Sequence, residues 1–258
     1  MAIVHTDPFS QAPVYIRLCF GDTELAVATA FIYRVGDTFY LVSNWHCFAG
    51  RNPCTTAPLS TKTAAIPDTV ACYLTLNGVY IAREWHTALL SKDDVSFWYE
   101  HPKHGRNIDI GVLPLALPER FKAMPINDMP DDKLRLRVSD DVFVLGYPLG
   151  LQGPLGLPIW KRASVASEPG TSDPSFMVDT ATRPGMSGSP VVQRFRGLFK
   201  HDPKIEGLGL EDWIGEGDSF VGVYSGRLGP SQLEAQLGVI WKRHLIDEII
   251  AGQKIYGR

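Results

Sequence analysis

Short runs of β-branched and aromatic residues recur along the chain, separated by clusters of Gly, Pro, Asn and Asp. Runs of this kind between turn-forming residues predict β-strands. The predicted strands are Val14 to Phe20, Leu25 to Val35, Thr38 to Ser43, Val70 to Leu76, Ile108 to Leu115, Val142 to Tyr147, Ser175 to Val178, Pro190 to Gln193 and Phe220 to Tyr224. Helical spacing of apolar residues is clearest from Lys242 to Ala251, where Gly252 is a helix stop. Many strands with one terminal helix predict an all-β protein rather than alternating βαβ units.

The stretch from Pro118 to Asp141 holds three prolines and several charges between two strand-rich halves. We interpret it as a linker. The predicted units are a first β-domain over residues 11–120, a linker over 121–141, a second β-domain over 142–241, and a C-terminal helix and tail over 242–258. Arg194 to Ser219, rich in Gly and charge, predicts a long loop. A functional lid and a disordered surface segment are equal alternatives for that loop.

The composition is that of an ordinary globular protein, with 45% hydrophobic and 21% charged residues among 258. Lys and Arg number 25 against 28 Asp and Glu, which gives no basic field for nucleic acid or anionic lipid. The N-terminus does not resemble a secretory signal, and no apolar run reaches the length of a membrane span. We therefore expect a soluble cytoplasmic protein with no nucleic-acid or membrane partner.

The cysteines and histidines give no metal-site spacing. Cys19, Cys47, Cys54 and Cys72 include no CxxC pair, so free thiols are the default. A bridge between Cys47 and Cys54 is conceivable, but it would rarely persist in a reducing compartment. His101 and His104 lack an acidic or thiolate companion and are expected on the solvated surface. We expect neither a metal nor an organic cofactor.

The strongest chemical motif is the segment Gly185-Met186-Ser187-Gly188-Ser189-Pro190, followed by two valines. Small residues around Ser187 let the backbone turn tightly, so that the hydroxyl projects while backbone N–H groups face a developing oxyanion. We assign that oxyanion hole to the N–H groups of Gly185 and Ser187. The alternative is a simple turn that enters a strand. An α/β-hydrolase elbow requires glycine at position 189, where this chain has serine, so we set that reading aside.

A serine nucleophile needs a base, and the base needs an orienting carboxylate. His46 lies just beyond the apolar run Tyr40 to Ser43, where the strand would fix its backbone. Asp109 is embedded in an apolar segment, where a carboxylate is costly unless it is paired. Judged alone, His46 could be an ordinary core residue and Asp109 a structural salt-bridge partner.

The order His46, Asp109, Ser187 resembles that of the trypsin and chymotrypsin superfamily of serine peptidases, and a bacterial-type intracellular member in particular. The resemblance implies two six-stranded antiparallel β-barrels with a C-terminal helix and with the catalytic triad between the barrels. It also implies an endopeptidase that acts on peptide or protein substrates. Gly146-Tyr147-Pro148 resembles the early second-barrel strand of such relatives.

The resemblance also assigns the substrate-binding positions. Residues 224–227 resemble the strand that pairs with an extended substrate, and Ser225 is expected to help orient Asp109. Ala181 and Thr182 fall at the base of the primary specificity pocket, and neither carries a charge. Asp179 and Arg227 are rival determinants, which leaves the cleavage preference open. The predicted binding residues are Ala181, Thr182, Tyr224, Ser225, Gly226 and Arg227.

Met186 stands where digestive relatives carry an aspartate that pairs with a newly cut N-terminus. Activation by N-terminal cleavage is therefore not expected. The oxyanion hole is either preformed or ordered by a regulatory protein partner or another part of the chain. Two other functions stay open, namely a non-catalytic peptide-binding module of this fold and an esterase that uses the same three residues.

Overall fold

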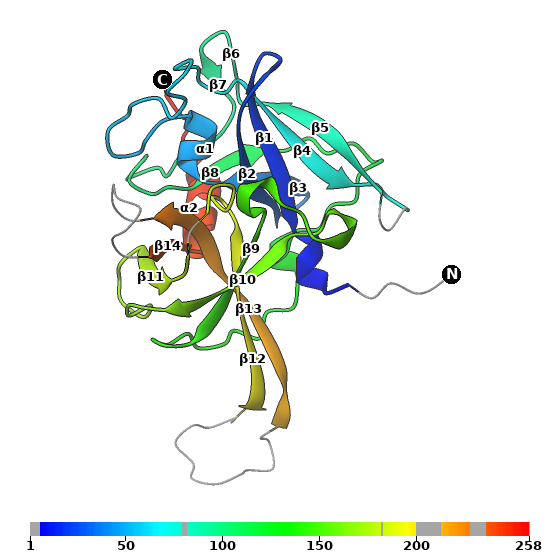
Figure 1. Cartoon of the computed structure of the whole chain (residues 1–258), viewed down its shortest axis with the longest axis vertical. Helices are drawn as coiled ribbons and strands as arrows, with labels where there is room; N and C mark the ends of the chain where they lie inside the picture. The colour runs from blue at the N-terminus through cyan, green and yellow to red at the C-terminus, as the bar shows by residue number, and fades with distance from the viewer. Residues whose placement is uncertain (1–5, 79–81, 182, 200–212, 228–235, 258) are drawn as a thin grey trace.

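Two six-stranded antiparallel sheets hold most of the strands (Figure 1). The computed structural model describes residues 6–78, 82–181, 183–199, 213–227 and 236–257. The first sheet has the order β5-β4-β1-β2-β3-β8. Its strands are β1 (Pro13–Phe20), β2 (Thr23–Val35), β3 (Thr38–Ser43), β4 (Thr69–Thr75), β5 (Arg83–Leu89) and β8 (Gly111–Pro114). The prediction of an all-β fold is confirmed.

The second sheet is a closed barrel with the order β10-β11-β14-β13-β12-β9, in which β10 also pairs with β9. Its strands are β9 (Asp141–Gly146), β10 (Ile159–Val165), β11 (Ser175–Asp179), β12 (Pro190–Phe199), β13 (Trp213–Arg227) and β14 (Leu237–Lys242). The shorter elements are η1 (Pro8–Gln11), α1 (Trp45–Ala49), β6 (Ser91–Lys92), β7 (Val95–Ser96), η2 (Ile126–Asp128), η3 (Pro148–Gly150), η4 (Pro154–Gly156) and α2 (His244–Gly252).

The first sheet does not close, which corrects the expectation of two barrels. Within the described residues its ladder ends at β5 on one side and at β8 on the other. The far edge of β8 is already occupied, because Tyr99 exchanges both backbone hydrogen bonds with Val112 at 2.7 and 3.1 Å. A strand of four residues with a bridge on its outer edge has no free edge to offer β5.

The predicted loop from Arg194 to Ser219 is corrected at both ends, because residues 194–199 continue β12 and residues 213–219 belong to β13, while residues 200–212 lie outside the described part of the chain. The hairpin extends well beyond the barrel (Figure 1). Its charges face one another across the ladder: Arg194 lies opposite Asp218, and Arg196 lies opposite Glu216. Opposite charges on facing positions stabilise a strand pair, so a charged segment here is a ladder rather than a loop.

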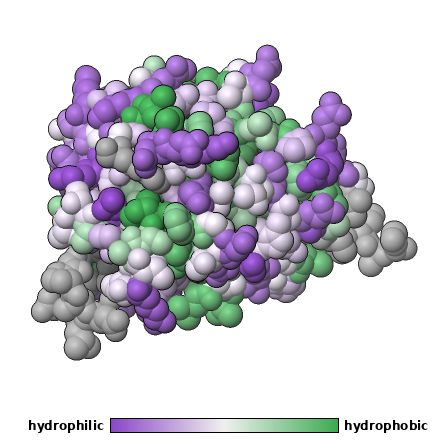
Figure 2. Space-filling model, turned by 90° about the horizontal axis from the view of Figure 1, so that it is seen from above, coloured by the Kyte–Doolittle hydropathy of each residue, from purple (hydrophilic) through white to green (hydrophobic). Residues whose placement is uncertain are grey.

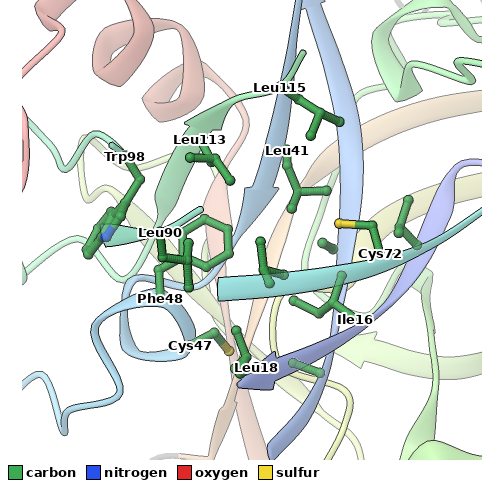
Figure 3. Close-up of a cluster of buried hydrophobic side chains, with 14 of the residues drawn as sticks. Ile16, Leu18, Leu41, Cys47, Phe48, Cys72, Leu90, Trp98, Leu113 and Leu115 are labelled. Atoms are coloured by element: carbon green, nitrogen blue, oxygen red, sulfur yellow. The ribbon is translucent and has the colours of Figure 1, made fainter. Parts of the chain in front are cut away.

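The hydrophobic core has three parts. One fills the first sheet, where Ile16, Leu41, Cys72 and Leu113 converge (Figure 3), and another fills the second barrel. The third joins the two sheets and receives the buried face of α2, which is Leu245, Ile246, Ile249 and Ile250. The terminal helix predicted from Lys242 to Ala251 is thus confirmed as α2, two residues later at its start. The two sheets are held together by a shared apolar layer at their junction.

On the face drawn in Figure 2, hydrophobic side chains form separate patches among hydrophilic ones. No helix in the described ranges is both long and apolar enough to cross a membrane. All four cysteines are free thiols. His101 is buried and contacts Glu248 at 3.0 Å, so its expected place on the surface is wrong.

Candidate active site

His46 lies in the short helix α1, directly after the apolar strand β3. Trp45, Cys47 and Phe48 are buried, which leaves His46 as the partly exposed side chain of this turn. Asn44, the residue just before α1, is fully buried, and its Nδ2 donates to the backbone oxygen of Asp109 at 2.7 Å. The strand end and this hydrogen bond fix the backbone from which His46 projects.

Asp109 contacts His46 at two points. Its Oδ1 accepts from the His46 backbone N–H at 2.9 Å, and its Oδ2 accepts from the ring Nδ1 at 2.7 Å. The Ser225 hydroxyl donates to the same Oδ2. Because a carboxylate only accepts, the imidazole carries its proton on Nδ1 and presents Nε2 as a proton acceptor. Asp109 precedes β8 by two residues, so the strand predicted from Ile108 begins later than expected.

The charge of Asp109 also sets the basicity of His46. The Asp109 side chain is only 6% exposed, so little water screens the pair. Burial of the imidazole opposes protonation, but the Asp109 carboxylate together with Cys47 outweighs it and holds the pKa of His46 well above its ordinary value. The site therefore combines a fixed tautomer with a strengthened base.

Ser187 projects from a tight turn that requires two glycines. Gly185 has φ of 90°, and a Cβ there would lie 2.3 Å from the Tyr147 backbone oxygen. Gly188 has φ of 79°, and its Cβ would lie 2.2 Å from both the Thr29 oxygen and the Ser43 hydroxyl. These positive φ values and close approaches exclude larger residues. They explain the spacing of small residues around the serine.

The Ser187 turn is hydrogen-bonded to both sheets. The Thr29 N–H of β2 donates to the Ser187 oxygen at 3.0 Å, and the Gly188 N–H donates to the Tyr224 oxygen of β13 at 3.0 Å. His46, Gly185 and Ser187 line one cavity of about 230 Å³. The structure thus brings His46, Asp109 and Ser187 together at the junction of the two sheets.

Two peptide planes of the turn are held by their carbonyl groups. The Pro184 oxygen accepts from the Leu149 N–H at 2.6 Å, and the Met186 oxygen accepts from the Ser189 N–H at 3.1 Å. Since N–H and C=O point in opposite directions across a trans peptide, the N–H groups of Gly185 and Ser187 point away from these anchors. Neither N–H has a hydrogen-bond acceptor within the described part of the chain. Two free donors near a serine hydroxyl can stabilise a negative oxygen.

The other predicted binding residues have different placements. Gly226 lies beside Ser187, since a Cβ at Gly226 would be 3.8 Å from the Ser187 hydroxyl. The Tyr224 ring is buried in the second barrel against Gly238, away from any open face. Ala181 is partly exposed. Thr182 and the side chain of Arg227 lie outside the described residues.

Thr29 is a site residue that the sequence analysis missed. Its hydroxyl donates to the Gly185 oxygen at 2.8 Å and accepts from the Tyr147 N–H at 3.1 Å. A fully buried hydroxyl in the run Ala28-Thr29-Ala30 needs such partners. The available signal was a polar residue inside an apolar strand, although that pattern does not show which groups its hydroxyl contacts.

The family model of the trypsin-like peptidase domain matches residues 28–197, more than half of the chain. The chain belongs to the trypsin-like peptidase family. No curated protein matches it in sequence.

Two solved protease structures are similar to this trypsin-like peptidase at low sequence identity. The serine endoprotease from Yersinia pestis is 12% identical, with a TM-score of 0.53 over 96% of this chain and 67% of that one. The Rv3671c protease from M. tuberculosis in its active form is 15% identical, with a TM-score of 0.48 over 96% and 83%. The likeness to the Yersinia structure supports a trypsin-like fold.

Proposed function

We propose that this chain is a serine endopeptidase that cleaves peptide bonds through an acyl-enzyme on Ser187. The observation that carries the proposal is the two-point hydrogen bonding between His46 and Asp109, at a cavity whose lining includes Ser187. Membership of the trypsin-like peptidase family supports the same reaction class. The substrate is a peptide or protein in an extended conformation.

In the first half-reaction, His46 Nε2 takes the proton of the Ser187 hydroxyl as Oγ attacks the carbonyl carbon. The carbonyl oxygen becomes negative and accepts from the N–H groups of Gly185 and Ser187. Asp109 stabilises the imidazolium that forms without taking its proton. The C–N bond then breaks as Nε2 protonates the leaving amine, and the acyl group stays on Ser187.

In the second half-reaction, water replaces the amine. His46 takes a proton from the water, whose oxygen attacks the acyl carbon, and Ser187 leaves with the proton that His46 returns. Each step moves one proton through Nε2. The reaction therefore needs no group beyond the residues named and water.

We infer that the oxyanion hole of this peptidase is preformed. Met186 is fully buried in the second barrel and cannot form an ion pair with a cut N-terminus. The anchors at Leu149 and Ser189 support both peptide planes from within the chain. Order at this turn then requires neither N-terminal cleavage nor a regulatory partner.

Hydrolysis of a peptide library by the wild type and two serine variants tests the proposal. Ser187→Ala should lower kcat by about 10⁴-fold or more. The matched control is Ser189→Ala, because the Ser189 hydroxyl is buried without a partner in the described residues and its loss should leave turnover intact. Equal activity of both variants would overturn the proposal, and hydrolysis of esters alone would indicate an esterase. Binding of peptides without turnover would indicate a non-catalytic module.

A further inference from the structure

The cavity beside Ser187 is almost entirely apolar apart from the reacting groups. Its floor is the buried Leu18 of β1, and its outer wall includes Leu59, which is 47% exposed. Val27 of β2 and Cys47 of α1 also line it, beside His46, Gly185 and Ser187 of the active site. No carboxylate, ammonium or guanidinium group is among the lining residues that the structure describes. Such a pocket favours an apolar side chain and disfavours a charged one.

The cavity lies on one defined side of the reacting serine. Its wall contains Pro184 and Gly185 from the Ser187 turn and Cys47 from α1. Residues of β13 are not among the lining residues, although Gly226 adjoins the Ser187 hydroxyl. The acyl half of a peptide that follows β13 therefore extends away from this cavity. The half that leaves as the amine passes His46 and enters it.

Strand β2 offers a backbone edge along the same path. The Thr29 N–H points toward the Ser187 oxygen, away from β1, and alternation directs the Val27 backbone to the same side. Pairing of β2 with β3 begins only at Phe31, so no described strand covers this edge at Val27. An extended leaving segment can hydrogen-bond there and direct its side chains alternately into the cavity.

Exposed leucines extend the apolar surface beyond the cavity mouth. Leu149 and Leu151 are 61% and 60% exposed. Leu149 adjoins the cavity because its N–H is hydrogen-bonded to the Pro184 oxygen, and the next residue follows, since a Cβ at Gly150 would lie 4.0 Å from the Val27 side chain. A leaving segment longer than one residue thus meets further apolar contacts.

We propose that this peptidase selects substrates by an apolar side chain, such as Leu, on the leaving side of the cleaved bond. The inference rests on the proposed serine peptidase function and adds the substrate class. It places a major determinant of selectivity on the side of the site lined by β2 and residues 59–67. Leu59 and Val27 are the specificity-determining residues.

Partition of the acyl-enzyme between water and added amines tests this selectivity without changing the acyl half. A p-nitrophenyl ester acylates Ser187, and an amino-acid amide then competes with water. The amine nitrogen bonds to the acyl carbon, gives its proton through His46 to the departing Ser187 oxygen, and yields a peptide bond. Leucinamide should capture the acyl group about 10- to 200-fold more efficiently than glycinamide, and aspartate amide should capture it least.

Leu59→Asp tests whether Leu59 forms part of the cavity wall that selects the leaving side of the substrate. It should reduce the advantage of leucinamide about tenfold and increase capture by lysinamide, because a carboxylate replaces an apolar group at the rim. Leu89→Asp is the matched control, since Leu89 is 48% exposed on β5 and does not line the cavity. Its partition ratios should equal those of the wild type.

The outcomes separate the two proposals. Acyl transfer to water with equal capture of leucinamide and glycinamide would overturn the selectivity and leave the peptidase function standing. A folded wild type that forms no acyl-enzyme would overturn the function and the selectivity with it. Equal effects of Leu59→Asp and Leu89→Asp would remove Leu59 from the wall.

Discussion

The backbone N–H of Leu149 donates to the Pro184 oxygen at 2.6 Å, and this contact joins a surface turn to the peptide plane that presents the Gly185 N–H. Leu149 has φ of 55°, in the left-handed region that leucine rarely occupies. Leu155 repeats the same Pro-Leu-Gly-Leu turn with φ of 62°. Only the first of these two turns is hydrogen-bonded to Pro184 in the described structure.

Leu149→Pro should lower kcat by up to about 100-fold, because it deletes the donor that anchors one side of the oxyanion hole. Proline cannot adopt the positive φ of either position, so Leu155→Pro, which disrupts the equivalent turn without touching Pro184, controls for that disruption. Leu149→Gly keeps the N–H and should retain activity. The measurement is steady-state hydrolysis with circular dichroism of each variant. Equal kcat for Leu149→Pro and Leu155→Pro would contradict the anchor.

Gly185→Ala should destabilise the fold by more than about 2 kcal/mol and abolish turnover. The new Cβ would overlap the Tyr147 oxygen at 2.3 Å, and φ of 90° is strained for alanine. Gly170→Ala is the control, since a Cβ there meets nothing within 4 Å. Urea unfolding compares the two variants. A Gly185→Ala protein as stable and active as Gly170→Ala would refute the close approach.

In the pH profile of kcat/KM, the midpoint of the acid limb should lie above pH 6.5, the ordinary pKa of histidine. His46 must be neutral to take the Ser187 proton, and the Asp109 carboxylate raises the pKa of His46 despite burial. Activity therefore rises with pH through that raised pKa. Asp109→Asn should move the limb to lower pH and reduce kcat by about 10⁴-fold. An unshifted limb in this variant would argue against the carboxylate as the cause.

Ser225→Ala should lower kcat by about tenfold, because the Ser225 hydroxyl donates to the Oδ2 that also accepts from His46. With one donor removed, Oδ2 interacts more strongly with the imidazolium, so the acid limb should move to higher pH. A full pH profile distinguishes this positioning role from loss of folding. Ser225→Thr, which keeps the hydroxyl, should restore the wild-type profile. A profile identical in wild type and Ser225→Ala would rule the role out.

The sequence was informative where chemistry depends on local pattern. Runs of β-branched and aromatic residues predicted β2 and β3, and the cost of burying a charge drew attention to Asp109. The open first sheet was not predictable, because it depends on a bridge between Tyr99 and Val112 that no local pattern encodes. The same limit applies to Arg194 and Asp218, whose charges suggest a loop until the ladder places them face to face. Thr29 shows the same limit at the active site, because its hydrogen-bond partners Gly185 and Tyr147 lie in the other half of the chain.

The central claim is that Ser187 is the nucleophile that His46 and Asp109 activate. Mass spectrometry of the protein treated with a serine-directed fluorophosphonate tests it most directly. One adduct on the peptide that contains Ser187, absent from folded Ser187→Ala and strongly slowed in His46→Ala, is the predicted result. An adduct that persists in Ser187→Ala, or that forms on another serine of the wild type, would contradict the account.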